Sequence, residues 1–437
     1  MKQFFLSICC LLSVFAFGQK TLNFSDCLAL AMKQNLEIQS ANVNEEVLKY
    51  QYKASYGRLA PELRAEGIQR ARFNQIYDFN TNSYIDNTVR ETRGTVRSNF
   101  NLFSGFNVWN TIKMQKQDYA ISKLNSQQQI REITISLAES YLTTLYLTEL
   151  VKINAQQIEL SEKQLALAQL KYEAGVIAES EVFKLKTQKA NEELDLVNNN
   201  NKLIDNWVRL KQLMNVPMQE EFVLEEPKVE LDSAVLSQTN TAEITSKIID
   251  FHPLTSMSLL RETRAKAALA VARSFRYPEL NAEFVYRTSS FSNLELVDQE
   301  LQFDRNRNGF LRFNLIIPIF NQLNTFSRIK QAKGGLKQAG IQIDRVRNQI
   351  TQEATKAIND TKTARKKVET ASIALEFSKK SYEADALKFE LGKINTNELN
   401  ITKNQYNNAR ADLIQSNYEL LYNNALINFY LGEPFKL

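Results

Sequence analysis

The residue types that most often carry chemistry are scarce in this chain of 437 residues. It contains one histidine, His252, and three cysteines, Cys9, Cys10 and Cys27. A single histidine excludes multi-histidine metal centres and the usual Ser-His and Cys-His catalytic pairs. Three cysteines cannot build a disulfide framework, and His252 stands before Pro253, where we expect a helix to start. The sequence therefore predicts no catalytic residue, no metal site and no cofactor, and we expect that the protein is not an enzyme.

The overall charge gives no reason to expect a nucleic-acid partner. The 54 Lys and Arg residues exceed the 49 Asp and Glu residues only slightly, for a net charge of +5. Glycine and proline are few, 12 and 7 in the whole chain, which favours long uninterrupted helices and strands over a turn-rich β-sandwich.

The first residues have the features of a secretory signal peptide. Lys2 supplies a positive charge, residues 4–17 are mostly apolar, and Ala16-Phe17-Gly18 offers small residues for cleavage before Gln19. We predict that residues 1–18 are removed on export. No later apolar run approaches the roughly 18 residues that a transmembrane helix needs, so membrane contact would have to be made by strands.

The mature chain is predicted to be a tandem duplication of one structural unit. Pro61-Glu62-Leu63 and Pro278-Glu279-Leu280 match at an offset of 278 − 61 = 217 residues. Three further pairs of segments match at the same offset: 112–116 with 329–333, 172–175 with 389–392, and 214–217 with 431–434. We therefore expect a first repeat at 19–217, a linker or small equatorial segment at 218–240, and a second repeat at 241–437.

Each repeat is predicted to contain two amphipathic strands after a helix of about 25 residues. Side chains alternate between apolar and charged types over 280–287 and 96–102, which is typical of strands with two different faces. We expect connections of about 20 polar residues, 74–93 and 289–309, and a last strand over 313–319. The charged residues that the strands would direct to one side are Arg64, Arg70, Arg97, Glu283, Arg287 and Arg312.

A long helical hairpin is predicted to complete each repeat. Apolar and small residues recur every three or four positions over 107–172 and 324–389, which is the pattern of a coiled-coil seam. About 65 helical residues would run roughly 100 Å. Gly175 and Gly392 are expected to end these helices, and helices over 181–214 and 398–431 are expected to return from the tips.

These elements together predict an assembly of three chains. A closed barrel is the only arrangement of strands that is stable in lipid, and four strands are too few to close one. Three chains would provide twelve strands and twelve long helical segments, with the charged strand faces lining water. The sequence thus predicts an α+β membrane protein, part barrel and part helical tunnel. A periplasmic coiled-coil scaffold or adaptor without a barrel is the alternative; it explains the leader and the seam but does not need the two-faced strands.

Over nearly the whole mature chain, the order of these elements resembles the TolC-like outer-membrane efflux proteins. Three kinds of segment carry the resemblance: the opening 22–31 with its short helix, the strand end Ile317-Pro318-Ile319-Phe320-Asn321, and the tips Tyr172-Glu173-Ala174-Gly175 and Phe389-Glu390-Leu391-Gly392. The family's Asn-Pro helix start is split here, because Asn35-Leu36 lacks the proline and His252-Pro253 lacks the asparagine.

The resemblance implies a homotrimeric exit duct for small molecules or proteins in the outer membrane of a Gram-negative bacterium. It would extend a tunnel into the periplasm, dock onto a periplasmic adaptor (membrane fusion) protein and serve an inner-membrane pump of the RND or ABC type. The outer-membrane lipid is the other expected partner. Drug efflux, metal-ion export and type I protein secretion share this architecture, and the sequence does not choose among them.

The resemblance also assigns roles to the hairpin tips. Glu398 occupies the place of acids that narrow the periplasmic aperture in the family, with Asn397 beside it and Glu181 as its counterpart in the first repeat. An ordinary first-turn acid that favours the helix dipole is the alternative for both glutamates. The expected adaptor-docking residues are Gly175, Val176, Gly392, Lys393 and Ile394; turn geometry alone would explain the two glycines equally well.

Overall fold

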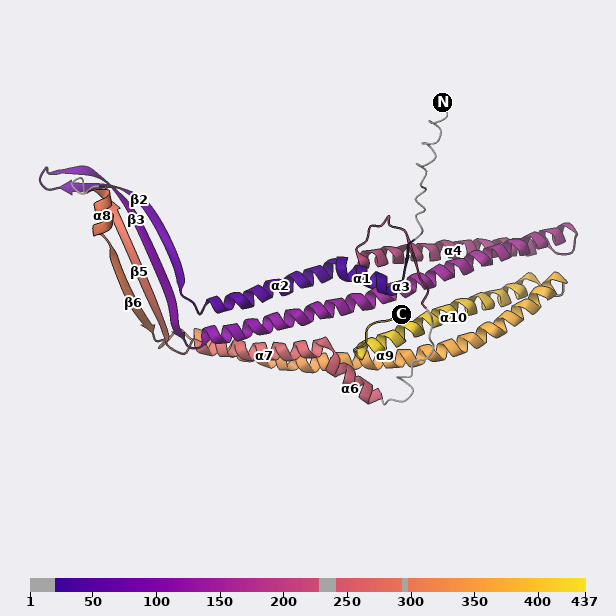
Figure 1. Ribbon diagram of the computed structural model, residues 1–437. Helices are drawn as coiled ribbons and strands as arrows, with labels where there is room; N and C mark the ends of the chain where they lie inside the picture. Colours follow the sequence, from indigo (N-terminus) through magenta and orange to yellow (C-terminus); the bar gives the residue numbers. More distant parts are fainter. Residues whose placement is uncertain (1–19, 228–240, 293–297) are drawn as a thin grey trace, which may run out of the picture. The chain divides into compact units, whose positions relative to one another are not determined.

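The computed structural model describes residues 20–227, 241–292 and 298–437 (Figure 1). The predicted signal peptide, residues 1–18, lies outside the described residues. The chain forms two compact units. Unit 1 comprises the described parts of 1–42, 125–255 and 346–437, and unit 2 comprises those of 43–124 and 256–345. In the part of the chain that the structure describes, no helix is long and apolar enough to cross a membrane.

Unit 2 contains a four-stranded antiparallel sheet in the order β2-β3-β5-β6. The strands are β2 (Glu62–Asp78), β3 (Ser83–Ser104), β5 (Glu279–Phe291) and β6 (Asn308–Ile316). Each repeat thus contributes two neighbouring strands, and the first repeat joins the second through β3 and β5. The prediction of four amphipathic strands is confirmed.

The predicted loop at 74–93 is wrong. β2 and β3 continue as a paired hairpin out to Asp78 opposite Ser83, and only four residues form the turn. Antiparallel pairing satisfies the backbone amides and carbonyls whatever the side chains are. Both faces of this part of the hairpin are largely exposed, so the sequence carries no apolar alternation there that would have indicated a strand.

The second predicted loop, 289–309, also contains regular structure. β5 continues to Phe291, and helix α8 (Gln299–Arg305) follows within the predicted loop. The Gln302 side chain donates to the carbonyl oxygen of Phe291 (3.1 Å) and accepts from its amide (2.7 Å), which fixes α8 against the end of β5. The last strand begins and ends earlier than the predicted 313–319: β6 runs from Asn308 to Ile316, and Pro318 beyond it has no amide hydrogen for the ladder.

Two helices start from related caps, and both caps lie in unit 1. The Asn35 side chain accepts from the amides of Glu37 (2.9 Å) and Ile38 (3.2 Å) at the start of α2 (Leu36–Gly57). At the equivalent position His252 Nδ1 accepts from the amide of Leu254 (3.2 Å) and starts α7 (Pro253–Ser274). The role predicted for His252 as a helix-start residue is confirmed.

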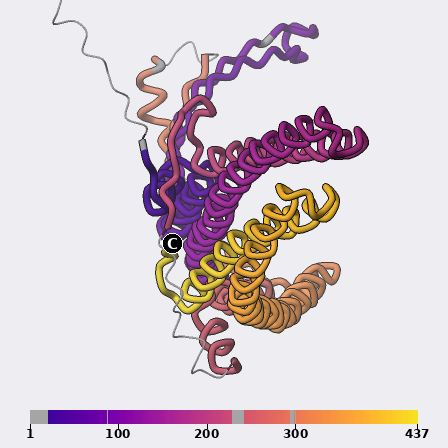
Figure 2. Tube along the Cα trace, turned by 90° about the vertical axis from the view of Figure 1, so that its right-hand side faces the viewer, coloured from indigo at the N-terminus to yellow at the C-terminus, as the bar shows by residue number. Residues whose placement is uncertain are grey.

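Two long hairpins fill unit 1, and Figure 2 looks onto their tips. The long arms are α3 (Asn107–Glu173) and α9 (Asn324–Glu390), each of 67 residues, and the returning arms are α4 (Glu179–Met214) and α10 (Thr396–Tyr430). Their predicted lengths are confirmed to within a few residues. Many of the predicted seam residues are buried, among them Leu137, Ser140, Thr144, Ile350, Ala354 and Thr361.

The rest of unit 1 includes one feature that the sequence did not indicate. Residues 218–227 were expected to be irregular, but Phe222–Leu224 forms a short strand, β4, parallel to β1 (Lys20–Leu22). The hydroxyl of Tyr141 donates to the carbonyl oxygens of Leu22 (3.3 Å) and Glu225 (2.6 Å) and so holds both strands against α3. Three-residue strands are too short for periodicity to detect. Helices α1 (Phe24–Gln34) and α6 (Thr241–Phe251) pack into the same core.

Candidate functional site

The register of the sheet gathers the predicted lumen residues on one face. Residues opposite each other in an antiparallel pair share a face, and the face repeats at every second residue. Arg64 lies opposite Arg97, and Arg97 opposite Val285. Glu283 lies opposite Arg312. Period two then adds the others, so the whole predicted set lies on this charged face: Arg64, Arg70, Arg97, Glu283, Arg287 and Arg312.

Ion pairs connect the strands across the charged face. Glu283 lies 3.5 Å from Arg97 and 3.6 Å from Arg312, and therefore joins β3, β5 and β6. Glu91 and Arg93 form another pair within β3. These pairs leave the face hydrated but only partly neutralised, which suits a surface that lines water.

The opposite face of the same sheet is apolar and exposed. Its side chains include Leu63, Val96, Phe284, Phe313 and Leu315, which are between 38% and 73% exposed. A water-soluble sheet would bury its apolar face and expose its charged one. Here these apolar side chains stay exposed in the described part of unit 2, which is typical of a surface that meets lipid or a partner.

Both hairpin tips are closed by the same motif. The amide of Gly175 bonds to the Tyr172 carbonyl and that of Val176 to the Lys171 carbonyl; in the second repeat Gly392 bonds to Phe389 and Lys393 to Lys388 in the same way. This is the Schellman pattern, which needs a left-handed residue at the helix end. Gly175 and Gly392 supply it with φ of 72° and 70°. The tips leave Val176 and Lys393 exposed and Ile394 half-buried.

The predicted aperture residues lie at the starts of the returning helices. Asn395 and Glu398 cap α10 reciprocally, since the Glu398 amide donates to Asn395 Oδ1 (3.0 Å) and Asn395 Nδ2 donates to Glu398 Oε1 (2.7 Å). Asn397 is exposed beside them. Glu181 lies 2.7 Å from Lys184, and hydrogen bonds from Lys184 and then Thr396 lower the pKa of Glu181. Glu398 therefore has a capping role that does not depend on any aperture.

One lysine ties the two tips of the protein together. Lys171, near the end of α3, donates through Nζ to the carbonyl oxygens of Phe389 (2.8 Å) and Glu390 (3.2 Å) at the end of α9. The same ammonium lies 4.9 Å from the centre of the Phe389 ring. A cation at a helix C-terminus satisfies carbonyls that have no partner in the helix.

A buried ionic cluster links the two hairpins, and sequence reasoning missed it. Lys403 on α10 and Glu192 on α4 are 0% and 2% exposed, with 2.8 Å between Nζ and Oε1. Ser161 contacts both groups, and Gln157 and Gln188 donate to Glu192 at 3.0 and 2.9 Å. Burial alone raises the pKa of Glu192, but these hydrogen bonds outweigh it and lower that pKa. The signal was present, because Glu192 lies in register with buried Val182 and Leu185.

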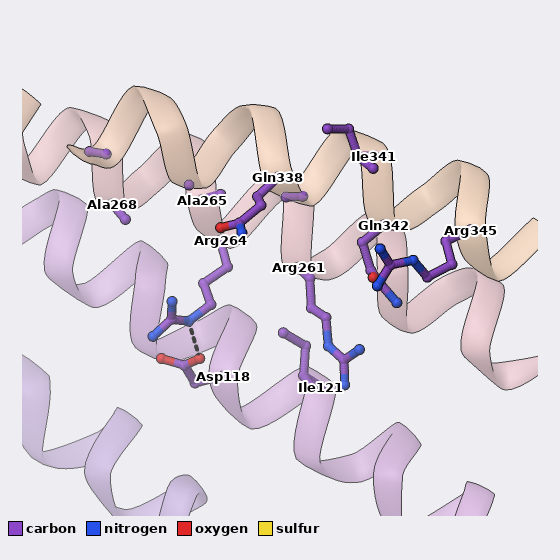
Figure 3. Close-up of a pocket in the computed structure, with 13 residues that line it drawn as sticks. Asp118, Ile121, Arg261, Arg264, Ala265, Ala268, Gln338, Ile341, Gln342 and Arg345 are labelled. Atoms are coloured by element: carbon purple, nitrogen blue, oxygen red, sulfur yellow. Dashed lines mark hydrogen bonds and ion pairs between the residues drawn. The ribbon is translucent and has the colours of Figure 1, made fainter. Parts of the chain in front are cut away.

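A groove in unit 2 with a volume of about 640 Å³ lies between α3, α7 and α9 (Figure 3). Small residues such as Ala265, Ala268 and Gly335 line it together with basic side chains. Arg264 on α7 is paired with Asp118 on α3, which joins the first repeat to the second. Within residues 20–227, 241–292 and 298–437, no group of three His, Cys, Asp or Glu side chains could hold a metal ion.

Several solved structures share this fold at low sequence identity. The Campylobacter jejuni CmeC outer membrane channel is 15% identical, with a TM-score of 0.80 over 94% of this chain and 86% of its own. CusC is 14% identical, with a TM-score of 0.79 over 94% and 92% of the two chains. The outer membrane protein VceC from Vibrio cholerae is 13% identical, with a TM-score of 0.77 over 94% and 97%.

No functionally curated protein sequence matches the chain. The sequence pattern of the family described as outer membrane efflux protein matches residues 27–216 and 252–433. The match includes both repeats, with their strands and long hairpins, and agrees with the fold of the three solved structures. The chain belongs to the outer membrane efflux protein family.

Proposed function

We propose that three copies of this protein form an exit duct through the outer membrane of a Gram-negative bacterium. The observation that carries the proposal is the two-faced sheet of unit 2, with the six predicted lumen residues on one face and exposed apolar side chains on the other. In a closed barrel the charged face would line the water-filled lumen, and the apolar face would contact lipid. The family to which the chain belongs supports this use of the sheet.

The number of strands explains why three copies are needed. The sheet has four strands and open edges at β2 and β6, and a four-stranded sheet cannot enclose a channel. Twelve strands from three copies would close a barrel with a lumen. The long hairpins of the three copies would then continue the duct as a helical tunnel in the periplasm.

The hairpin tips are the proposed contact with the rest of an export machine. They are closed by tight turns and carry exposed side chains, which makes them available to a periplasmic adaptor protein and, through it, to an inner-membrane pump of the RND or ABC type. Gly175, Val176, Gly392, Lys393 and Ile394 are the proposed docking residues. The cargo would be small molecules or proteins, which would leave the cell through the duct without contacting the lipid of the outer membrane.

The proposal is tested by the mass and conductance of the protein extracted from outer membranes in detergent. Light scattering should give about three mature chains per particle, and planar bilayers should show discrete conductance steps from the same sample. A monomer or dimer without conductance, found in the periplasm, would contradict the duct and favour a coiled-coil scaffold.

Glu398 is proposed to narrow the periplasmic aperture together with Asn397 and Glu181. Three Glu398 carboxylates around one axis would attract cations, so Glu398→Gln should lower the cation preference of the conductance several-fold. Glutamine keeps the capping hydrogen bonds of α10, and the helix should therefore stay intact. The measurement is the reversal potential in a salt gradient.

Glu376→Gln is the matched control, because Glu376 is an exposed helical acid that pairs with Lys380 four residues away. Equal reversal potentials in the Glu398 variant, the Glu376 variant and the unmodified protein would show that Glu398 is a cap alone.

A further inference from the structure

Beyond the end of β5, the strands β2 and β3 continue as a two-stranded ribbon (Figure 1). β5 ends at Phe291, opposite Glu91 of β3, whereas β2 and β3 stay paired as far as Asp78 opposite Ser83. Residues 72–89, called the ribbon below, lie at the opposite end of these strands from α2 and α3. In the proposed duct the helices extend into the periplasm, so the ribbon would stand outside the cell.

The two faces of the ribbon continue the two faces of the sheet. Side chains alternate along a strand and share a face with the residue opposite. Ile76 and Ile85, which lie opposite each other, therefore continue the charged face, and Tyr77 and Tyr84 continue the apolar one. The face that continues the apolar side, called the outward face below, carries exposed side chains: Phe73, Gln75, Tyr77, Tyr84, Asp86 and Thr88.

Three aromatic rings form a cluster at the end of the ribbon. The ring of Tyr77 lies 5.2 Å from that of Phe79 and 5.1 Å from that of Tyr84, both edge to face. The Tyr77 hydroxyl donates to Asn82 Oδ1, which fixes the central ring. The outer rings stay uncovered, since Phe79 is 87% and Tyr84 71% exposed. Phe73, four residues before Tyr77 on β2, adds another exposed ring. Rings that are held in place and left uncovered are typical of a binding surface.

The aromatic cluster lies too far along the strands to contact the hydrocarbon of the membrane. Tyr286 is the last ring of the apolar face before the ribbon, and it lies opposite Val96. Tyr84 is twelve residues from Val96 on β3, which is about 40 Å along a strand. The apolar band of an outer-membrane barrel is only about 25 Å tall. On this face the β3 side chains between the two levels are small or polar, among them Thr92, Gly94 and Arg90.

The polar side chains around the rings suit an uncharged ligand with many hydroxyl groups. On the outward face Gln75 lies opposite Asp86, between the ring of Phe73 and the aromatic cluster. An amide both donates and accepts hydrogen bonds, and a carboxylate accepts them. One arginine, Arg72, stands against Asp78 and Asp86 in the ribbon, which gives it a slight negative charge. Phosphate groups would therefore be repelled rather than attracted.

We propose, on the basis of the duct proposed above, that the outward face of the ribbon binds the uncharged saccharide chain of the glycolipid in the outer leaflet. The exposed rings of Phe73, Phe79 and Tyr84 stack on the C–H faces of sugar rings. Gln75 and Asp86 bond the hydroxyl groups between them. Because the outward face continues the side of the sheet that would contact lipid, the sugar chains of the surrounding glycolipid lie against it.

A pair of double variants of the full chain tests the proposal. Phe79→Ser with Tyr84→Thr removes the two most exposed rings, and threonine suits a strand. The matched control is Ile76→Thr with Ile85→Thr, because these residues lie opposite each other on the other face of the same ribbon and are 43% and 45% exposed.

The probe is the polysaccharide released by mild acid from the lipopolysaccharide of the bacterium that carries the protein, labelled at its reducing end with a fluorophore. Its binding to the purified protein in neutral detergent is followed by fluorescence anisotropy. The aromatic variant should bind roughly ten-fold more weakly than the unmodified protein, and the isoleucine variant within about two-fold of it.

Equal binding by the aromatic variant and the unmodified protein would overturn the proposal, as would an equal loss in both variants. Phe73→Thr, which leaves the aromatic cluster intact, should also weaken binding and keeps the proposal testable if the double variant does not fold. The lipid part that carries the phosphates, added unlabelled, should not compete. Competition by this lipid but not by unlabelled polysaccharide would mean that the ribbon binds headgroups, and the saccharide surface would be overturned.

The mass and conductance of the same sample separate this proposal from the duct. Three chains per particle with conductance steps, but without polysaccharide binding, would overturn the saccharide surface and leave the duct standing. One chain per particle without conductance would overturn both, since the ribbon would then not face the outer leaflet.

Discussion

The buried pair of Lys403 and Glu192 is the residue-level feature with the largest expected effect on stability. Both groups are buried: Lys403 is compensated by Glu192 and Ser161, and Glu192 also accepts from Ser161, Gln157 and Gln188. Removing one partner leaves a charge in a low-dielectric interior, which typically costs about 3–5 kcal/mol. We predict that Lys403→Met lowers the midpoint of thermal unfolding, followed by helical circular dichroism in detergent.

The exposed pair of Lys163 and Glu159 provides the control for this variant. Its side chains are 71% and 64% exposed, and exposed pairs contribute about 0–1 kcal/mol, so Lys163→Met should leave the midpoint almost unchanged. The double variant Lys403→Met with Glu192→Leu should recover much of the loss. Equal midpoints for Lys403→Met and Lys163→Met would show that the buried pair is not a determinant of stability.

His252 makes the stability of unit 1 depend on pH. Burial, and then the charge of Arg131, lower its pKa from 6.5 to about 4. The unfolded chain therefore takes up a proton near pH 6.5 and the folded chain only near pH 4, so stability is complete above pH 6.5 and falls between these values. The loss amounts to about 3 kcal/mol.

The chain itself offers the substitution that removes this dependence, because Asn35 holds the equivalent cap in the first repeat. His252→Asn should keep the α7 cap and flatten the fall of the unfolding midpoint between pH 6.5 and 4, compared with the unmodified protein. A slope unchanged by the substitution would mean that His252 does not titrate as its burial indicates.

At the scale of single residues, the sequence predicted which face of a strand a residue lies on better than which distant residue it contacts. The six residues predicted to line a lumen follow from period two, and the register places all of them on one face. Lys403 was overlooked because its partner is 211 residues away, and nothing local to a lysine shows that an acid will meet it in a core. The polar network around Glu192 depends on tertiary packing that only the structure supplies.

Among the elements, the hairpin tips allow the sharpest test of backbone conformation. Gly392 has φ of 70°, and a β-carbon there would meet no atom within 4 Å. Any loss on substitution by alanine therefore comes from the left-handed backbone alone, about 1–2 kcal/mol. We predict that Gly392→Ala increases proteolysis at the tip and weakens adaptor binding, whereas Gly392→Asn, which tolerates this conformation, has a smaller effect.

Gly340→Ala is the control for the tip variants, because Gly340 lies within α9 and also has open space around it. Alanine is the better helix former, so this change should be neutral or stabilising. Adaptor binding lost in both Gly392→Ala and Gly392→Asn, with the tip equally resistant to protease, would favour a direct docking role over turn geometry.

The long helices were predictable because their signals are repeated many times along one seam. The ends of α3, α4, α9 and α10 fell within a few residues of expectation, since Gly175 and Gly392 mark the turns. The β2–β3 hairpin was missed beyond residue 73, where neither face is buried and the apolar pattern disappears. β1 and β4 were missed because three residues hold less than two periods.

At the scale of the whole molecule, the tandem duplication determines the order of the strands in the sheet. It pairs β3 with β5 inside the chain and leaves β2 and β6 at the edges of the sheet. The offset of 217 residues was visible in the sequence, but which surfaces remain uncovered became visible only from burial in the structure.

The most direct test of the central claim is thiol labelling along β5 in intact outer membranes with a charged, membrane-impermeant maleimide. Single cysteines replace Glu283, Phe284, Tyr286 and Arg287. Cys27 contributes little background, because it is fully buried and burial raises the pKa of its thiol to about 12. A water-filled barrel predicts strong labelling at 283 and 287 and at least ten-fold slower labelling at 284 and 286, since those two would face lipid. Equal labelling at all four positions would mean that water reaches both faces of the sheet, and the duct would be contradicted.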